Sequence, residues 1–462
     1  MRRFVLLALL AGCTTVGPDY KRPAVELPSD YPTEIQSEGQ IPADWWKLYR
    51  DPLLDELIAS ARSRNADIRL AAARVQEAEA LAREAGAARF PEVGGTFSAT
   101  RSRVSTRTVP PPQAAAPLER SQHQLAASTS FELDFWGRLA RATEAAQASL
   151  LASRYSQEVV ALSLSGATAQ SYFTLRSLDA QIAVLEATIQ VRRESLSIAR
   201  ARADAGLASE LDVHQAQGAL SDALVQRREA GRQRSLAERQ LAQLTGRLEL
   251  ALPREKLAGD LFALPLPPTP PPGLPSELLA RRPDIRSAEA AMIAANAQIG
   301  VARAALFPTI SLTAALGAQS AELSQLLSSG AGIWSVGVGL AAPIFDAGRR
   351  EARVEQAEAR RAQALAGYQR SIEAAFREVA DALSSVEQSG GAEAELAARL
   401  QAARSALELS GERYRAGYSP YLEVLDAQRT ANDAELAYVR NRQARLAFSV
   451  DLMKALGGGW KD

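Results

Sequence analysis

Few side chains in this sequence have the types and spacing needed for catalysis. There is one cysteine, Cys13, and there are two histidines, His123 and His214. Neither histidine has cysteines or carboxylates near it at metal-ligand spacing, so we expect no metal site. The sequence also lacks a Gly-x-Ser-x-Gly elbow, a His-Glu-x-x-His pair and a phosphate-binding glycine loop. We therefore expect no enzyme activity and no cofactor.

Cys13 stands at the end of a secretion signal. Two arginines follow Met1, and residues 4–10 form an apolar run that is far shorter than the ~20 residues of a membrane-spanning helix. Leu10-Ala11-Gly12-Cys13 resembles the bacterial lipobox, which implies removal of residues 1–12 and acylation of the Cys13 thiol. The next residue is Thr14, where an aspartate would resemble the inner-membrane retention signal. This resemblance favours the outer membrane.

The spacing of Glu423 and Asp426 places two carboxylates close together. They lie three residues apart at an expected helix start, so their carboxylates share one face. Acids in a first turn can simply complement the helix dipole, which contributes about 0.3–1 kcal/mol. We assign only that role to Glu210 and Asp212, and the sequence alone leaves both readings open for the first pair.

Composition favours long helices and excludes some partners. Lys plus Arg and Asp plus Glu each number 53, so the formal net charge is zero. A neutral chain gives no electrostatic footprint for nucleic acid. Aromatic residues make up only 6%, and the Ala-, Arg- and Glu-rich stretches are typical of long helices that approach one another closely.

The chain is a tandem duplication. Residues 67–91 align with residues 284–308 at a constant offset of 217, and blocks beginning at Arg202 and Arg413 align at an offset of 211. The first copy is therefore six residues longer between these blocks. We place the extra residues in a loop over residues 101–124, which contains Val109-Pro110-Pro111-Pro112.

Both copies predict the same elements. A helix ends at Phe90 or Phe307, each followed by proline. Two strands follow, near residues 92–136 and 308–345. A long helix then runs without proline to Gly206 or Gly417, and about 68 residues at ~1.5 Å each make a rod on the order of 100 Å. A return helix follows each glycine.

These elements define the expected organisation. It comprises a signal peptide (residues 1–12), a lipid-anchored N-terminal segment (13–64), the first repeat (65–246), a Pro-rich linker (247–276), the second repeat (277–456) and a tail (457–462). Coiled-coil spacing predicts packing along the long helices. The apolar stripes are Leu175, Leu178, Ile182, Leu185 and Ile189 in the first, and Leu365, Tyr368, Ile372, Phe376, Val379, Leu383 and Val386 in the second.

The strand segments alternate between apolar residues and small or polar residues. The apolar positions are Val93, Gly95, Phe97 and Ala99; Leu125, Ala127, Phe131, Leu133 and Phe135; Ile310, Leu312, Ala314 and Leu316; and Trp334, Val336, Val338, Leu340 and Ala342. This pattern fits a membrane barrel with a wet lumen, but also an antiparallel sheet over a soluble core. The lipid signal favours the membrane. Because lipid tolerates no open sheet edge, four strands per chain then require several chains to close one barrel.

The motifs, taken in order, resemble the outer membrane factor family of TolC-like channels and its OprM-like lipoprotein branch. They are Val16-Gly17-Pro18-Asp19-Tyr20, Arg282-Pro283-Asp284-Ile285, Phe307-Pro308, Pro343-Ile344-Phe345-Asp346-Ala347-Gly348, and Tyr414-Arg415-Ala416-Gly417 through Leu422-Glu423-Val424-Leu425-Asp426-Ala427-Gln428. The resemblance covers essentially the whole mature chain. It implies a mainly α protomer with four strands, and a homotrimer with a 12-stranded barrel and a helical periplasmic tunnel.

The same resemblance implies roles for individual residues and partners. Gly206 and Gly417 would be the periplasmic tip turns, and Glu423 and Asp426 would form acidic rings at a gate. Tyr414 matches a tyrosine of the family's closed-state network, whereas Ser419-Pro420 stands where its arginine partner is usual. The implied partners are a periplasmic adaptor (membrane fusion) protein, an inner-membrane transporter of the RND type and outer-membrane lipid.

Efflux of drugs or other small toxic compounds is the function that the resemblance implies for a lipoprotein member. One alternative keeps the fold and changes the cargo, namely the exit channel of a type I protein secretion system. A periplasmic coiled-coil adaptor is a second alternative, but it predicts no duplicated strand–helix unit. A soluble helical scaffold is the third.

Overall fold

The computed structural model describes residues 15–24, 42–107, 117–252, 261–267, 269 and 278–458. The predicted signal peptide, Cys13, much of the Pro-rich linker and the end of the tail lie outside these residues. The chain divides into two compact units. The first comprises residues 1–24, 74–154 and 287–368, and the second comprises residues 25–73, 155–286 and 369–462.

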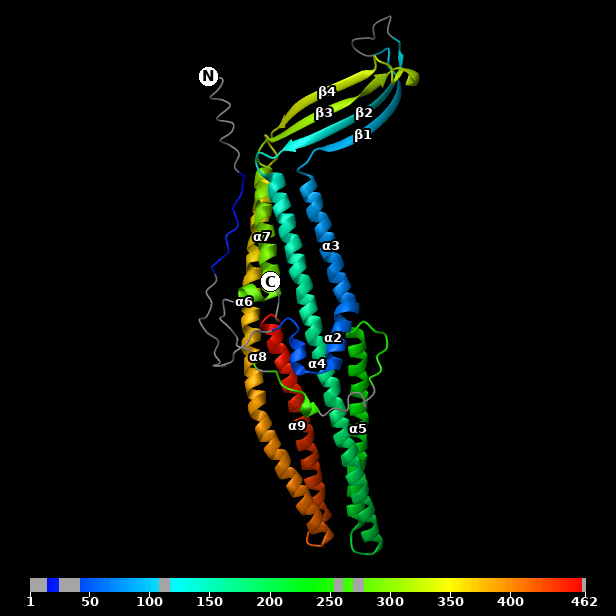
Figure 1. Cartoon of the computed structure of the whole chain (residues 1–462), viewed down its shortest axis with the longest axis vertical. Coiled ribbons are helices and arrows are strands. Elements are labelled where there is room, and N and C mark those ends of the chain that lie inside the picture. Colours follow the sequence, from blue (N-terminus) through cyan, green and yellow to red (C-terminus); the bar gives the residue numbers. More distant parts are fainter. Residues whose placement is uncertain are drawn as a thin grey trace. The chain divides into compact units, whose positions relative to one another are not determined.

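The first unit contains a four-stranded antiparallel sheet (Figure 1). Its strands are β1 (Glu92–Arg103), β2 (Glu119–Leu133), β3 (Thr309–Ser320) and β4 (Gly332–Ala341). The order in the sheet is β1-β2-β3-β4, so each copy of the repeat contributes one hairpin and the two hairpins meet where β2 pairs with β3. The outermost strands, β1 and β4, form the two edges.

The strand register brings the predicted apolar positions onto one face. Phe97 lies opposite Leu125, Phe131 opposite Leu312, and Leu316 opposite Trp334. Side chains of directly paired residues share a face, so the four apolar rows join into one continuous surface. Its large exposed members, called here the apolar face, are Val93, Phe97, Leu125, Leu312, Leu316, Trp334, Val336, Val338 and Leu340. Trp334 is 78% exposed and Val338 is 73% exposed.

The first hairpin extends further than its sequence predicts. Residues 101–124 were expected to form a loop, but β1 continues to Arg103 and β2 begins at Glu119. The pairs Arg101–Ser121 and Arg103–Glu119 extend the ladder beyond the apolar segment. Backbone hydrogen bonds need no apolar side chain, so a strand can outlast the alternation that reveals it in a sequence.

Helices follow and precede the strands as the duplication predicts. They are α3 (Ala66–Ala87), α4 (Arg138–Asp204), α7 (Pro283–Ala304) and α8 (Arg349–Arg415). The predicted limits of the two long helices are confirmed to within two residues. Where strands meet helices in the first unit, Trp136 donates from Nε1 to the Pro308 carbonyl at 2.7 Å and stacks on Phe307 with centroids 4.7 Å apart.

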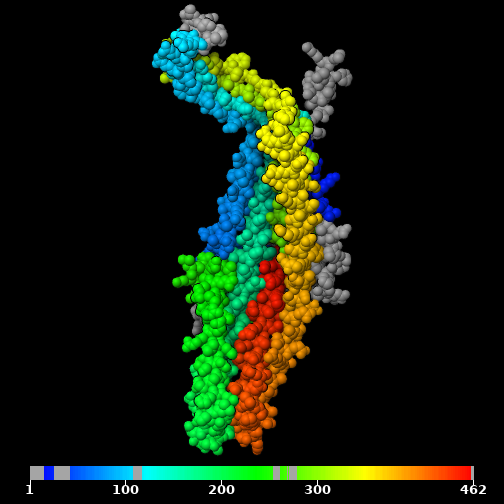
Figure 2. Space-filling view, turned by 180° about the vertical axis from the view of Figure 1, so that it is seen from behind, coloured from blue at the N-terminus to red at the C-terminus, as the bar shows by residue number. Residues whose placement is uncertain are grey.

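The second unit is helical. Besides most of α4 and α8, it contains η1 (Trp45–Tyr49), α2 (Pro52–Arg64), α5 (Glu210–Leu244), η3 (Leu261–Ala263), α6 (Leu278–Arg281) and α9 (Tyr421–Ala455). In Figures 1 and 2, α8 and α9 run side by side as one helical hairpin. The predicted stripe of α4 is confirmed, since Leu175, Leu178, Ile182, Leu185 and Ile189 are all buried.

A buried polar network fixes the N-terminal helix of this unit to α4. The Asp51 carboxylate caps α2 by accepting from the Leu53 backbone N–H at 3.0 Å. It also accepts from the Tyr172 hydroxyl at 2.6 Å and from the Arg176 guanidinium at 3.2 Å. Burial, followed by the hydrogen bond to Asp51, raises the pKa of Tyr172 above its ordinary value.

Among the helices that the structure describes, none has the length and apolar character of a membrane span.

Candidate functional site

The two long hairpins turn at Gly206 and Gly417, the positions predicted as tip turns. Gly206 has φ +72° and Gly417 has φ +80°, which is the left-handed conformation that favours glycine. The two turns make the same pair of backbone hydrogen bonds. Leu207 N–H donates to the Arg202 carbonyl and Gly206 N–H to the Ala203 carbonyl, each at 2.8 Å. This is a Schellman cap, and it closes both helices in the same way.

The predicted acids Glu423 and Asp426 lie in the first two turns of α9 with solvent-exposed side chains. Glu423 forms an ion pair with Arg413 at 3.2 Å, and Asp426 accepts a hydrogen bond from Arg429 at 3.0 Å. The carboxylate side chains are 43% and 66% exposed, respectively. Such exposed pairs contribute about 0–1 kcal/mol, so they leave both carboxylates accessible to ions.

Tyr414, at the end of α8, is buried and contacts the other hairpin. Its carbonyl accepts from Arg202 of α4 at 2.8 Å, and the same guanidinium lies 4.7 Å from the Tyr414 ring centroid. Tyr414 also packs on Tyr421 of α9, with ring centroids 5.5 Å apart. Burial raises the pKa of both tyrosines. Tyr414 therefore has an arginine partner, although not at the position where the sequence motif suggested one.

Further polar contacts join α4 to α9 above this point. Gln428 donates to the Ser195 hydroxyl at 2.8 Å and Thr188 donates to Asn432 at 3.0 Å. Arg440 donates to Gln181 at 3.2 Å. The α4 residues in these contacts recur every seven positions, as expected for one face of a supercoiled helix. We call this set the α4 polar ladder: Gln181, Thr188, Ser195 and Arg202.

A cavity of about 350 Å³ lies beside the ladder. Tyr414, Tyr421, Ser195 and Gln428 contribute to its wall, together with apolar residues of α4 and α8. The hairpins therefore meet here through these polar contacts and through a buried apolar cluster that includes Leu196 and Leu220 of the first hairpin and Val424 of the second, with the cavity beside them. Polar contacts of this kind can break and re-form at low cost, because water replaces each hydrogen bond that is lost.

Sequence reasoning missed Arg202 and Arg413 as candidate site residues. The signal was present, because both arginines belong to the aligned blocks of the duplication. Their different contacts could not be read from the alignment. Arg202 turns toward the neighbouring hairpin, whereas Arg413 pairs with Glu423 within its own hairpin.

Known proteins share this architecture over almost the full chain. The model of the outer membrane efflux protein family matches residues 57–247 and 274–458. That match covers most of the chain. The chain belongs to the outer membrane efflux protein family.

Two curated relatives and one solved structure illustrate the similarity. The solvent efflux pump outer membrane protein SrpC of Pseudomonas putida is 37% identical over 98% of this chain and 97% of its own length. The cation efflux system protein CusC of Escherichia coli is 33% identical over 99% and 98%. The open state of the Neisseria gonorrhoeae MtrE outer membrane channel superposes with a TM-score of 0.85 at 31% identity, covering 96% of this chain and 98% of that channel.

The family and protomer fold predicted from the motifs are confirmed. This efflux protein is an outer membrane protein that is mainly helical, with four strands and a duplicated unit. The family match, together with relatives similar over nearly their whole length, sets aside the adaptor and the soluble scaffold. His123 lies on β2 and His214 on α5, and the described residues contain no group of three or more metal-ligating side chains.

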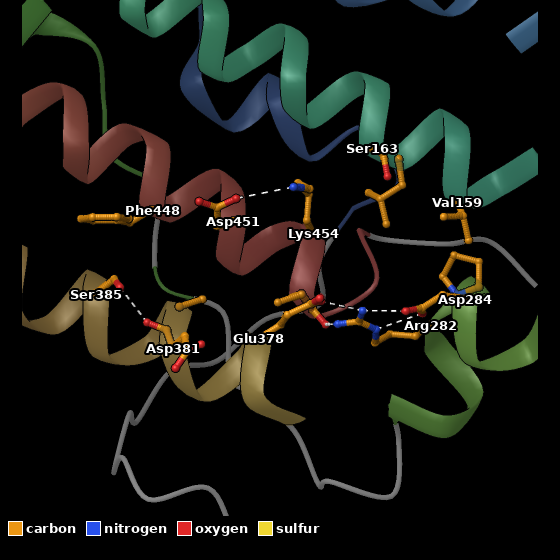
Figure 3. Close-up of a pocket in the computed structure, with 14 residues that line it drawn as sticks. Val159, Ser163, Arg282, Asp284, Glu378, Asp381, Ser385, Phe448, Asp451 and Lys454 are labelled. Carbon is orange, nitrogen blue, oxygen red and sulfur yellow. Dashed lines mark hydrogen bonds and ion pairs between the residues drawn. The ribbon is translucent and has the colours of Figure 1, made fainter. Parts of the chain in front are cut away.

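The efflux protein has a second notable cavity, of about 500 Å³, in its helical unit (Figure 3). Arg282, in the wall of this cavity, is buried and donates to Asp284 at 2.7 Å, to Glu378 at 2.7 Å and to the Ala455 carbonyl at 2.9 Å. It thereby joins the start of α7 to α8 and to the end of α9. Since all three acceptors lie in the cavity wall itself, we interpret Arg282 as a structural residue, called here a joint because it holds helices together.

Proposed function

We propose that this chain forms the passive, gated exit duct of a tripartite efflux pump for drugs or other small toxic compounds. The observation that supports this most directly is the apolar face of the sheet. Its large side chains are exposed, while the opposite face carries Thr96, Ser98, Ser311 and Thr313. A sheet that is apolar outside and small or polar inside suits a wall between lipid and a water-filled passage.

The sheet edges support a multimeric wall. Along β1 and β4 one side of each strand has no neighbouring strand among the residues that the structure describes. Unpaired backbone groups cost several kcal/mol each in lipid, so these edges must pair with further strands. The edge of β1 from one chain would pair with that of β4 from the next. Three chains would form a 12-stranded barrel, and their helical hairpins would enclose a tunnel in the periplasm.

The tip residues support a gate. In a trimer, the exposed carboxylates of Glu423 and Asp426 would repeat three times around the tunnel axis. Rings of carboxylates attract cations and narrow the passage. The contact of Arg202 with Tyr414 would hold the closed arrangement by tying one hairpin to the other. When the channel opens, this contact would be lost, and Arg202 and Tyr414 would both be exposed to water.

The anchor and partners complete the proposal. We infer that the Cys13 thiol carries the covalent lipid, which would retain each protomer at the outer membrane. A duct of this kind has no catalytic step, so the energy for transport would come from an inner-membrane transporter, which we infer to be of the RND type. A periplasmic adaptor would connect the two. The names of the relatives, which refer to solvent and cation efflux, favour small cargo over proteins.

Deletion of the gene in its native host tests the function. We expect cells without the chain to accumulate a small lipophilic dye and to lose tolerance to organic solvent, with secreted proteins unchanged. Complementation with the wild-type gene should restore both properties. Unchanged dye accumulation together with loss of a secreted protein would contradict the proposal and favour a protein secretion channel.

A further inference from the structure

The apolar face of β1 ends in two arginines. Val93 and Phe97 alternate along this face, and Arg101 and Arg103 continue the same alternation. Both arginines are exposed, and Arg101 has 76% of its side chain accessible. They lie on the side of the sheet that we assign to lipid, at the end opposite the helices of the first unit. We call Arg101 and Arg103 the outer arginine pair.

The neighbouring strand neutralises only one member of the pair. Glu119 of β2 accepts from Arg101 at 2.8 Å and lies opposite Arg103 in the register. No acceptor for the Arg103 guanidinium is found among the described residues. His123, on the same face, adds a further nitrogen donor or acceptor near this end. The outer end of β1 therefore presents a net positive charge beside the apolar face.

The position of the pair matches a membrane boundary. Arg103 follows Val93 by ten residues, which at ~3.3 Å per residue corresponds to ~33 Å along the strand. With a strand tilt of about 40°, this is ~25 Å across the membrane, the height of the apolar band of outer-membrane barrels. The guanidinium groups would thus reach the level of the outer-leaflet head groups, with their stems lying along the apolar surface.

The second hairpin lacks this feature. At the corresponding end of β3 and β4, residues 318–331 contain no lysine or arginine. Leu323 and Leu327 are instead exposed there, at 60% and 85%. The positive charge therefore belongs to one hairpin of the duplication only. A general need for interfacial charge would have placed arginines on both.

We propose that the outer arginine pair binds the phosphate groups of a phosphorylated glycolipid in the outer leaflet. A guanidinium presents two parallel N–H donors that match phosphate oxygens, and such charge-assisted hydrogen bonds are among the strongest in proteins. An anion placed there would supply an acceptor for Arg103, which has none among the described residues. This inference rests on the proposed function, because it requires the apolar face to lie in lipid.

The full-length protein, purified in detergent and placed in nanodiscs, tests the inference. The probes are bisphosphorylated lipid A, dephosphorylated lipid A and phosphatidylglycerol, each added at a low fraction to neutral lipid and counted by native mass spectrometry. We expect wild-type protein to retain bisphosphorylated lipid A in preference to both others. The variant R101Q/R103Q should lose this retention roughly tenfold or more, because it loses charge-assisted hydrogen bonds.

Arg120 provides a matched control. It lies at the same level of the hairpin, opposite Ser102, but on the other face of the sheet. R120Q should bind bisphosphorylated lipid A like the wild type. Equal retention by R101Q/R103Q and wild type, or wild-type retention that ignores the phosphates, would overturn the inference. Equal retention of phosphatidylglycerol would also overturn it, by reducing the site to general attraction of anions.

Single-channel conductance of the same samples separates this inference from the proposed function. R101Q/R103Q should insert into planar bilayers and conduct like the wild type. Normal conductance without preferential lipid A binding would leave the duct standing and remove the glycolipid site. A wild-type chain that does not insert would overturn both.

Discussion

The two copies of the duplicated unit solve the same structural problem with different side chains. In the first copy, Asn65 donates to the Leu244 carbonyl at 2.9 Å and so joins the start of α3 to the end of α5. In the second, Arg282 donates to the Ala455 carbonyl at 2.9 Å and joins α7 to α9. The equivalent joint is thus a neutral amide in one copy. It is a buried guanidinium with two carboxylate partners in the other.

The tips repeat this contrast. Gly206 and Gly417 close identical turns, but the helices that follow begin differently. Ser209 caps α5 through its side chain, whereas Pro420 at the start of α9 has no side-chain cap. The duplication has preserved the backbone and changed the polar side chains.

The joints should differ most in stability. Arg282→Ala removes the buried positive charge that pairs with the Asp284 and Glu378 carboxylates. Because these carboxylates are partly exposed to solvent, we expect the free energy of unfolding to fall by about 2 kcal/mol. Asn65→Ala removes neutral hydrogen bonds and should cost about 1 kcal/mol. Thermal unfolding of the detergent-solubilised proteins, followed by helical circular dichroism, would rank the two. Equal losses of stability would show that the charged contacts of Arg282 contribute no more than the neutral contacts of Asn65.

The acids of the second tip should control conductance. Replacing Glu423 and Asp426 together by alanine would remove both of the proposed carboxylate rings, so we expect a several-fold rise in single-channel conductance and weaker cation selectivity. Asp212 of the first tip aligns with Glu423, so Asp212→Ala is the matched control. It should change neither conductance nor cation selectivity. If the double variant conducts and selects like the wild type, these acids do not form the gate.

The contact between hairpins should bias the channel toward its closed state by a smaller amount. Arg202→Ala removes one hydrogen bond and one cation–π contact from Tyr414, together about 1 kcal/mol, which is roughly fivefold in the ratio of open to closed channels. Arg413→Ala loses only a half-exposed ion pair and serves as the control. Open probability in planar bilayers reports the effect, and identical values for the two variants would remove Arg202 from the closed-state contact.

The helix caps should give the smallest effects. Ser209→Ala removes the side-chain cap of α5 and should lower stability by about 0.5–1 kcal/mol. Pro420→Ser introduces a cap at the equivalent position of α9 and should raise stability by a similar amount. Hydrogen exchange of the first turn of each helix measures both changes. Opposite signs are expected, and a loss in both variants would mean that proline is itself required at the second tip.

Much of the fold could be predicted because periodic patterns carry it. Glycine turns at 206 and 417, proline after Phe90 and Phe307, and the apolar alternation of the strands set the elements and the duplication. The part of the hairpin beyond Thr100 could not be predicted. Its strands pair through backbone hydrogen bonds, and the polar side chains there neither show an apolar alternation nor prevent the pairing. Contacts between elements were also hidden. The partner of Tyr414 proved to be Arg202, over two hundred positions away, which no local motif reveals.

The central claim is that the apolar face lies in lipid and that edges β1 and β4 of neighbouring chains join to complete the wall. Cysteine pairs scanning residues 93–99 of β1 against residues 334–340 of β4 test it most directly in native membranes. Within one chain these edge strands are three strand spacings apart, ~14 Å, too far for a disulfide, which needs Cα atoms about 4.4–6.8 Å apart. We expect disulfide-linked oligomers up to a closed trimer. Only monomeric chains at every pair, under oxidising conditions, would contradict it.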